Sequence, residues 1–260
     1  MYNFDYEKPS TVADAVAALG DEDAQALGGG QTLIPTLKQR LASPTTLVSL
    51  SGISEMQGIT DDGGSITIGG ATVHADVAAN GAIAALSDLA GNIGDPAVRN
   101  RGTIGGSLAN NDPSACYPSA ALGLGATIVT NTREIAADDY FQGMFTTALD
   151  EGEIITAVKV PKPEAANYQK FEQPASRFAL VGVFVAKTSG GVRVAVTGAS
   201  EEGVFRWSEA EAALNGSFSA DALEGMAPDA DGMIADLHGT SAYRAHLVGV
   251  MTRRAVAACS

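Results

Sequence analysis

The sequence has few cysteines and few basic residues, and each shortage excludes a class of protein. Its two cysteines, Cys116 and Cys259, lie far apart and form no CxxC pair. We therefore expect no disulfide framework, no zinc or other metal site and no four-cysteine iron–sulfur cluster. Sixteen lysines and arginines stand against 30 aspartates and glutamates, a formal charge of −14. Because nucleic acids are bound by clustered basic surfaces, we expect no nucleic-acid partner.

Long apolar runs are also missing from the chain. Charged residues or glycines interrupt the short apolar runs, so no membrane span is expected. The opening residues, Met1–Tyr6, include acidic and aromatic residues where a secretory signal has a basic and then an apolar stretch. We therefore expect a soluble, cytoplasmic protein.

Glycine, in contrast, is abundant and clustered. The 30 glycines exceed the roughly 7% that is typical of proteins. The first cluster follows a short apolar segment in the sequence LGGGQTLIP at residues 27–35. A backbone without Cβ atoms can approach a ligand closely and direct several N–H groups at a pyrophosphate. A flexible turn is the alternative, but it does not explain the ordered polar and apolar residues around the glycines.

A second cluster lies in the stretch GDPAVRNRGTIGGSLANNDP at residues 94–113. Its Thr103 and Ser107 hydroxyls suit phosphate or ribityl oxygens, and Asp112 suits a ribose or ribityl hydroxyl. Neither cluster has the spacing of a P-loop or of a Rossmann motif. Together, the two loops predict a ligand with two phosphates, held between two lobes.

Apolar periodicity predicts short strands and helices in mixed order. We expect helices at residues 73–86 and 242–258, and a long irregular segment at 92–113. Strands are expected at residues 168–171, 179–187 and 191–197, after a boundary marked by Pro161 and Pro163.

The two glycine-rich frames resemble those of the FAD-binding medium subunits of the molybdenum hydroxylases, the family of aerobic carbon monoxide dehydrogenase and xanthine dehydrogenase. The similarity covers essentially the whole chain, including FDYEKPSTVADAVAAL, YQKFEQPASRFALVGV and DLHGTSAYRAHLVGVMTRRA. It implies an α+β fold with a two-lobed FAD-binding domain of the vanillyl-alcohol-oxidase type at residues 1–165, its lobes at about 1–56 and 57–165. A small α+β C-terminal domain would follow at residues 166–260.

The resemblance also implies where FAD binds, without a covalent bond. The first loop would hold the pyrophosphate and adenosine end, and the second loop would face it. Lys170 would contact the flavin, and Phe178 would lie against the isoalloxazine; family members often have a polar or acidic residue where this chain has Arg177. The implied cofactor-binding residues are Gly28, Gly29, Gly30, Gln31, Thr32, Leu33, Ile34, Thr103, Ile104, Gly105, Gly106, Ser107, Asn110, Asp112, Lys170 and Phe178.

From the residue pattern alone, several of these side chains have ordinary explanations. Phe178 would be a core residue, and Lys170 a solvated strand residue. His74, at the start of a predicted helix, is expected to be a surface or capping histidine rather than a flavin contact. Cys116 is expected to be a small buried apolar residue.

The family resemblance implies an electron-transfer role without catalytic residues of its own. Electrons would pass from two [2Fe–2S] clusters on a small subunit to FAD and then to an external acceptor, while a large subunit with the molybdenum cofactor oxidises the substrate. The complex would be a dimer of heterotrimers. One alternative is a stand-alone FAD-dependent oxidoreductase, which would need an acid or base that the C-terminal segment does not clearly offer. The other is a non-catalytic module that has lost FAD, which the retained glycines and hydroxyls disfavour.

Overall fold

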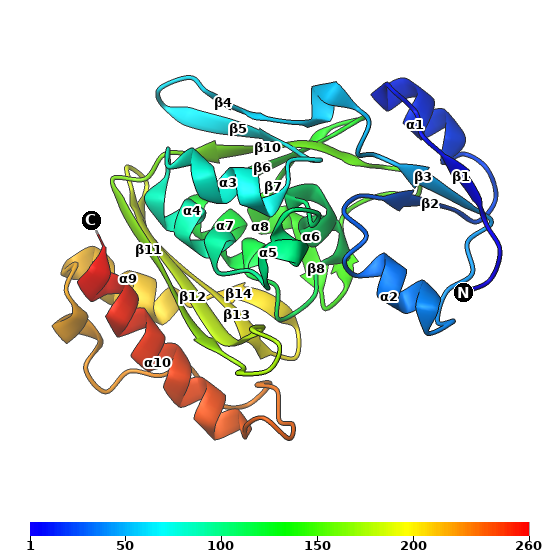
Figure 1. Cartoon of the computed structure of the whole chain (residues 1–260). Coiled ribbons are helices and arrows are strands. Elements are labelled where there is room, and N and C mark those ends of the chain that lie inside the picture. The colour runs from blue at the N-terminus through cyan, green and yellow to red at the C-terminus, as the bar shows by residue number, and fades with distance from the viewer. Residues whose placement is uncertain (260) are drawn as a thin grey trace.

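Three β-sheets, with helices packed on them, organise the chain. The computed structural model describes residues 1–259, and Figure 1 shows the sheets succeeding one another from the N-terminus to the C-terminus. Helices and strands are mixed throughout, so the expected α+β class is confirmed. Among the described residues, no helix has both the length and the apolar composition to cross a bilayer.

The first sheet is small and parallel. Its strand order is β1-β3-β2, and every residue of the central strand β3 is buried. A parallel strand covered on both faces is typically a continuous apolar run, which Leu47 and Val48 provide here. The elements of this part are β1 (Asp5–Glu7), α1 (Val12–Ala18), β2 (Ala24–Leu27), α2 (Leu33–Lys38), β3 (Thr46–Ser49) and the 3-10 turn η1 (Ser54–Met56).

The second sheet is antiparallel, with the order β4-β5-β10-β6-β7. Its strands are β4 (Ile59–Asp61), β5 (Ser65–Gly69), β6 (Thr127–Thr130), β7 (Glu134–Ala136) and β10 (Ile155–Pro161). The helices that follow β5 are α3 (His74–Asn80), α4 (Ala84–Gly91), α5 (Pro96–Arg99), α6 (Ile104–Asn110), α7 (Tyr117–Leu124) and α8 (Ala137–Tyr140), with a hairpin of β8 (Phe141–Gly143) and β9 (Thr146–Thr147) after them.

Two predictions for this part were wrong. The single helix expected at residues 73–86 is divided into α3 and α4, because Gly81 takes the left-handed conformation, with φ of 75°, that ends a helix. The segment expected to be irregular contains α5 and α6. Helix α6 begins where the Thr103 side chain accepts a hydrogen bond from the N–H of Gly106. Its two glycines have low intrinsic helix propensity, which hid the helix in the sequence.

The third sheet is antiparallel and follows its chain order, β11-β12-β13-β14. The three strands predicted here are confirmed, as is the final helix. The elements are β11 (Ala165–Glu172), β12 (Ala179–Thr188), β13 (Gly191–Ser200), β14 (Gly203–Arg206), α9 (Ser208–Gly216), the 3-10 turn η2 (Ala220–Leu223) and α10 (Ser241–Ala258).

The third sheet is covered on both faces. Val183 and Val185 face a core shared with α9 and α10, while Phe184 belongs to the core of the second sheet. Gly123 of α7 allows this contact, because a Cβ there would lie 2.8 Å from the Phe184 ring. Figure 1 shows α7 between the second and third sheets. The second and third sheets thus contribute to one shared core. The expected division into domains at residues 1–165 and 166–260 stays a prediction.

An arginine is buried under the last helix. Arg244 of α10 is 2% exposed. Its Nη1 donates to the backbone oxygens of Leu180 and Gly198, each at 2.7 Å, and its Nη2 donates to Asp236 Oδ2 at 2.8 Å. The guanidinium therefore ties α10 to the two central strands of the third sheet.

Replacing Arg244 by methionine should destabilise the chain strongly. The substitution leaves two buried carbonyl oxygens without a donor, and we expect a loss of about 3 kcal/mol in the free energy of unfolding. Urea denaturation measures it. The matched control is Arg254→Met on the same helix, where the side chain is exposed and the change should stay within about 0.5 kcal/mol. Equal effects of the two substitutions would contradict a structural role for Arg244.

Candidate functional site

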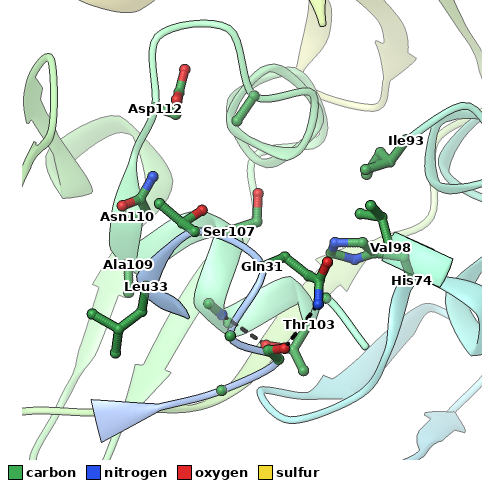
Figure 2. Close-up of a pocket in the computed structure, with 18 of the residues that line it drawn as sticks. Gln31, Leu33, His74, Ile93, Val98, Thr103, Ser107, Ala109, Asn110 and Asp112 are labelled. Carbon is green, nitrogen blue, oxygen red and sulfur yellow. Dashed lines mark hydrogen bonds between the residues drawn. The ribbon is translucent and has the colours of Figure 1, made fainter. Parts of the chain in front are cut away.

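A cleft of about 650 Å³ lies where the three parts of the chain meet. This volume falls within the range of about 300–1,000 Å³ that is usual for ligand sites. The first glycine-rich loop, residues 28–33, and the second, residues 102–107, form facing walls. Figure 2 shows Gln31 and Leu33 of the first loop and Thr103 and Ser107 of the second around the same space.

The two glycine loops touch each other at Gly29. A Cβ on Gly29 would lie 1.9 Å from the backbone oxygen of Arg101, so only glycine allows this approach. Gly30, with φ of 71°, then turns the chain into α2. Through this contact, the cleft wall formed by the first loop touches the wall formed by the second loop.

The first loop presents unpaired backbone donors. Among residues 1–259, the N–H groups of Gly29, Gly30, Gln31 and Thr32 donate to no protein acceptor. Successive free N–H groups in a glycine-rich turn form a concave site for an anion such as a phosphate. The loop therefore suits the charged, central part of a ligand with a pyrophosphate.

The second loop uses most of its backbone donors within the protein. Gly105 N–H donates to the oxygen of Gly70 at 2.9 Å, and a Cβ on Gly105 would lie 2.5 Å from that oxygen. Gly106 N–H donates to Thr103 Oγ1. The glycines of α6 thus serve close packing, and the groups left for a ligand on this wall include the Ser107 hydroxyl.

Asn110, the last residue of α6, and Asp112 beyond it continue this wall. Figure 2 shows Asn110 near Ser107 and Asp112 farther along the chain, both on the side of the view away from His74. Asp112 Oδ1 accepts from the N–H of Ser114 at 2.8 Å, which fixes the carboxylate and leaves its other oxygen free. Asn111 between them takes the left-handed conformation and is anchored on the β8–β9 hairpin through Gly143 and Thr146.

The residues predicted to bind a cofactor largely converge here. Two of them do not line the cleft: Ile104 is 2% exposed in the core, and Ile34 packs against Gly30. Phe178 lines the cleft and is 48% exposed, so the pattern-based expectation of a core phenylalanine was wrong. The predicted residues that do line the cleft are Gly28, Gly29, Gly30, Gln31, Thr32, Leu33, Thr103, Gly105, Gly106, Ser107, Asn110, Asp112, Lys170 and Phe178.

His74 lies in the cleft wall, and the expectation of a surface or capping histidine was wrong. The side chain is 5% exposed, and its ring packs against Tyr117 with centroids 5.2 Å apart. A Cβ on Gly102 would lie 2.5 Å from His74 Nε2, so the second loop makes room for this imidazole. The residues around His74 in the sequence do not predict that its side chain is buried, because Gly102, which makes room for the imidazole, is distant in sequence.

The environment of His74 keeps the ring neutral. Burial, and then the positive charge of Arg99, lower its pKa from the ordinary value of 6.5 to about 4. Nδ1 has no partner. Cys116, which also lines the cleft, is 6% exposed, as expected for a small apolar residue, and burial raises the pKa of its thiol. Neither group is ionised at neutral pH.

The burial of His74 predicts a specific loss of stability in acid. Between pH 6.5 and about 4 the unfolded histidine binds a proton and the folded one does not, so stability is complete above pH 6.5 and falls as the pH drops to about 4. We expect about 3 kcal/mol from this group. Urea denaturation across this range should show a shallower pH dependence for His74→Gln than for the original chain. Parallel curves would refute the assignment.

The cleft and its two loops agree with comparisons to known proteins. A family model described as the FAD binding domain in molybdopterin dehydrogenase matches residues 2–163. The carbon monoxide dehydrogenase medium chain of Afipia carboxidovorans is 33% identical, over 98% of this chain and 96% of that protein. The nicotine 6-hydroxylase medium subunit of Paenarthrobacter nicotinovorans is 32% identical, over 96% and 95%.

A solved structure extends the similarity to the third sheet. It is a carbon monoxide dehydrogenase from Hydrogenophaga pseudoflava that lacks the Mo-pyranopterin moiety of its molybdenum cofactor. Its chain has a TM-score of 0.87 and 33% identity to this one, and the match covers 99% of this chain and 97% of that one. The family model spans more than half of the sequence, and the relatives span nearly all of it. This chain therefore belongs to the FAD-binding medium subunits of the molybdenum hydroxylases, a family of oxidoreductase flavoproteins.

Proposed function

We propose that this chain is the FAD-carrying electron-transfer subunit of a molybdenum-containing hydroxylase or dehydrogenase. It would stand between [2Fe–2S] clusters of a small partner subunit and an external electron acceptor. The observation that carries the proposal is the cleft itself, which is lined by the second glycine loop and by Gly29, Gly30, Gln31 and Thr32, whose N–H groups are free.

The chemistry of the cleft fits FAD. The free N–H groups suit the pyrophosphate, the Ser107 hydroxyl and the Asp112 carboxylate suit ribityl or ribose hydroxyls, and the exposed Phe178 ring suits an aromatic ring system. When bound, a flavin supplies the ability to exchange electrons singly or in pairs. The protein's part is to hold the cofactor, orient it and set its electrostatic surroundings.

The ionisable groups of the cleft favour electron transfer over a stand-alone oxidoreductase. His74 stays neutral and the Cys116 thiol stays protonated at neutral pH. Hydrogen bonds from Arg133, with Nη2 2.8 Å from Oε2, hold the pKa of Glu153 well below its ordinary value. None of these three is poised to exchange a proton near pH 7, as a general acid or base must be.

The partners are inferred from the relatives. Proteins named medium chains imply larger and smaller companions, and the related carbon monoxide dehydrogenase has a molybdenum cofactor. We propose a large molybdenum-cofactor subunit and a small [2Fe–2S] subunit, assembled as a dimer of heterotrimers in the cytoplasm. In this assembly the substrate would be oxidised on the large subunit.

Replacing Gly29 by alanine should weaken FAD binding. Its Cβ would lie 1.9 Å from Arg101 O, so the loops must separate, and we expect about ten- to hundredfold weaker binding. Titration of the FAD-free chain, followed by flavin fluorescence, measures the dissociation constant. The control is Gly64→Ala, since a Cβ there meets nothing within 4 Å. Unchanged affinity in Gly29→Ala would place the cofactor elsewhere.

The electron-transfer role is tested on the purified native complex. We expect flavin absorbance, co-purifying molybdenum and [2Fe–2S] subunits, and reduction of the flavin by substrate only when all subunits are present. A yellow chain that oxidises a substrate alone would contradict the role and favour the stand-alone enzyme. A chain that binds no FAD would contradict both.

A further inference from the structure

Lys170 of β11 has no hydrogen-bond donor left for a ligand. Its Nζ lies 2.6 Å from the backbone oxygen of Asn92, 2.8 Å from that of Arg177 and 3.9 Å from Cys116 Sγ. A lysine ammonium has three N–H groups. All three are thus directed at protein acceptors, although the side chain lines the cleft.

The two oxygen acceptors belong to different parts of the fold. Asn92 caps the C-terminal end of α4 in the second part of the chain. Arg177 lies in the loop between β11 and β12 of the third sheet. A cation at a helix C-terminus is favoured, because the last carbonyl groups of a helix are unpaired and carry partial negative charge. Lys170 therefore joins α4 to the loop that precedes Phe178.

Few other contacts hold this loop. Residues 174–178 are exposed. Within the loop, Gln173 N–H donates to Phe178 O at 2.9 Å and Arg177 N–H donates to Gln173 O at 2.8 Å. Arg177 has φ of 61°, a left-handed conformation that costs free energy for a residue with a Cβ. In this conformation, the backbone oxygen of Arg177 accepts the hydrogen bond from Lys170 Nζ.

The Arg177 side chain adds a weaker contact across the same gap. Its Nη1 donates to Gly94 O at 3.3 Å. Arg99 Nη1 donates to Ile93 O at 3.0 Å and to Gly94 O at 2.9 Å. None of the salt bridges among residues 1–259 involves Lys170, Arg99 or Arg177. These cations are therefore used to bind the carbonyl groups of residues 92–94.

We propose that Lys170 is a latch: it fastens the Gln173–Phe178 loop to the C-terminal end of α4 and so closes the cleft at the end where Phe178 lies. Lys170 is then a positioning residue for Phe178 rather than a direct hydrogen-bond donor to the cofactor. The proposal depends on contacts within the chain and stands whether or not FAD occupies the cleft.

Hydrogen exchange of the full chain without FAD tests the latch. Lys170→Met keeps the length of the side chain but removes its three donors. Because hydrogen bonds to charged groups are strong, we expect the amides of Gln173 and Arg177 to exchange about tenfold to a hundredfold faster. Trypsin should also cleave after Arg177 more rapidly.

The matched control is Lys187→Met. Lys187 lies on β12 of the same sheet and forms an exposed ion pair with Glu164, so its loss should leave the loop amides unchanged. Unchanged exchange at Gln173 and Arg177 in Lys170→Met would overturn the latch. So would an equal increase in both variants, because it would indicate general loosening of the sheet.

FAD binding separates the latch from a direct charge effect. In the latch model, Lys170→Met releases FAD faster than the unsubstituted chain does. Lys170→Arg keeps the charge but not the tetrahedral arrangement of donors, so it also speeds exchange of the loop amides. If Lys170→Met shifts only the flavin reduction potential and leaves the loop exchange as in the original chain, the latch is refuted and Lys170 acts through its charge. Failure of the original chain to bind FAD would contradict the proposed function but not the latch.

Discussion

The close approach of the two glycine loops is the constraint on which the cleft depends. Gly29 lies so near the Arg101 backbone that no side chain fits between them, and within the second part of the chain Gly105 packs closely against Gly70. The Gly29 contact sets the separation of the two walls where the loops meet. The two loops differ in their backbone donors: the first leaves the N–H groups of Gly29–Thr32 free for an anion, whereas the N–H groups of Gly105 and Gly106 in the second donate within the protein.

The other end of the cleft depends on the third sheet being fixed to the second part of the chain. Helix α7 has every residue buried, and Gly123 lets it pack against the Phe184 ring. Lys170 and Phe178 are carried by this sheet, so their placement beside the cleft follows from an apolar core some distance away. A shared core is a rigid connection, in contrast to the hydrogen bonds that hold the Gln173–Phe178 loop.

The sequence predicted the features that depend on neighbouring residues and missed those that depend on residues distant in the chain. The strands β12 and β13 were recognisable because they are long apolar runs, and Gly28–Gly30 because clustered glycines require a local reason. Helix α6 was missed, since glycines at 105 and 106 conceal a helix that is stabilised by its Thr103 cap and its packing. The burial of His74 and of Arg244 was missed because their partners, Gly102 and Gly198, lie elsewhere in the sequence. The contacts of the Lys170 ammonium could not be predicted, because their acceptors are backbone oxygens, which every residue type has.

The first part of the chain has a modest core of its own. The buried cluster around its sheet consists of Ala15, Val48, Ile53, Met56, Ala71 and Ile154, and the last two are supplied by the second part. A ligand that bridges both walls adds its binding free energy to the stability of whatever holds them together. The flavin supply of the cell would then act on the lifetime of the protein: chains made when FAD is scarce would open more often at the first sheet and meet proteases sooner.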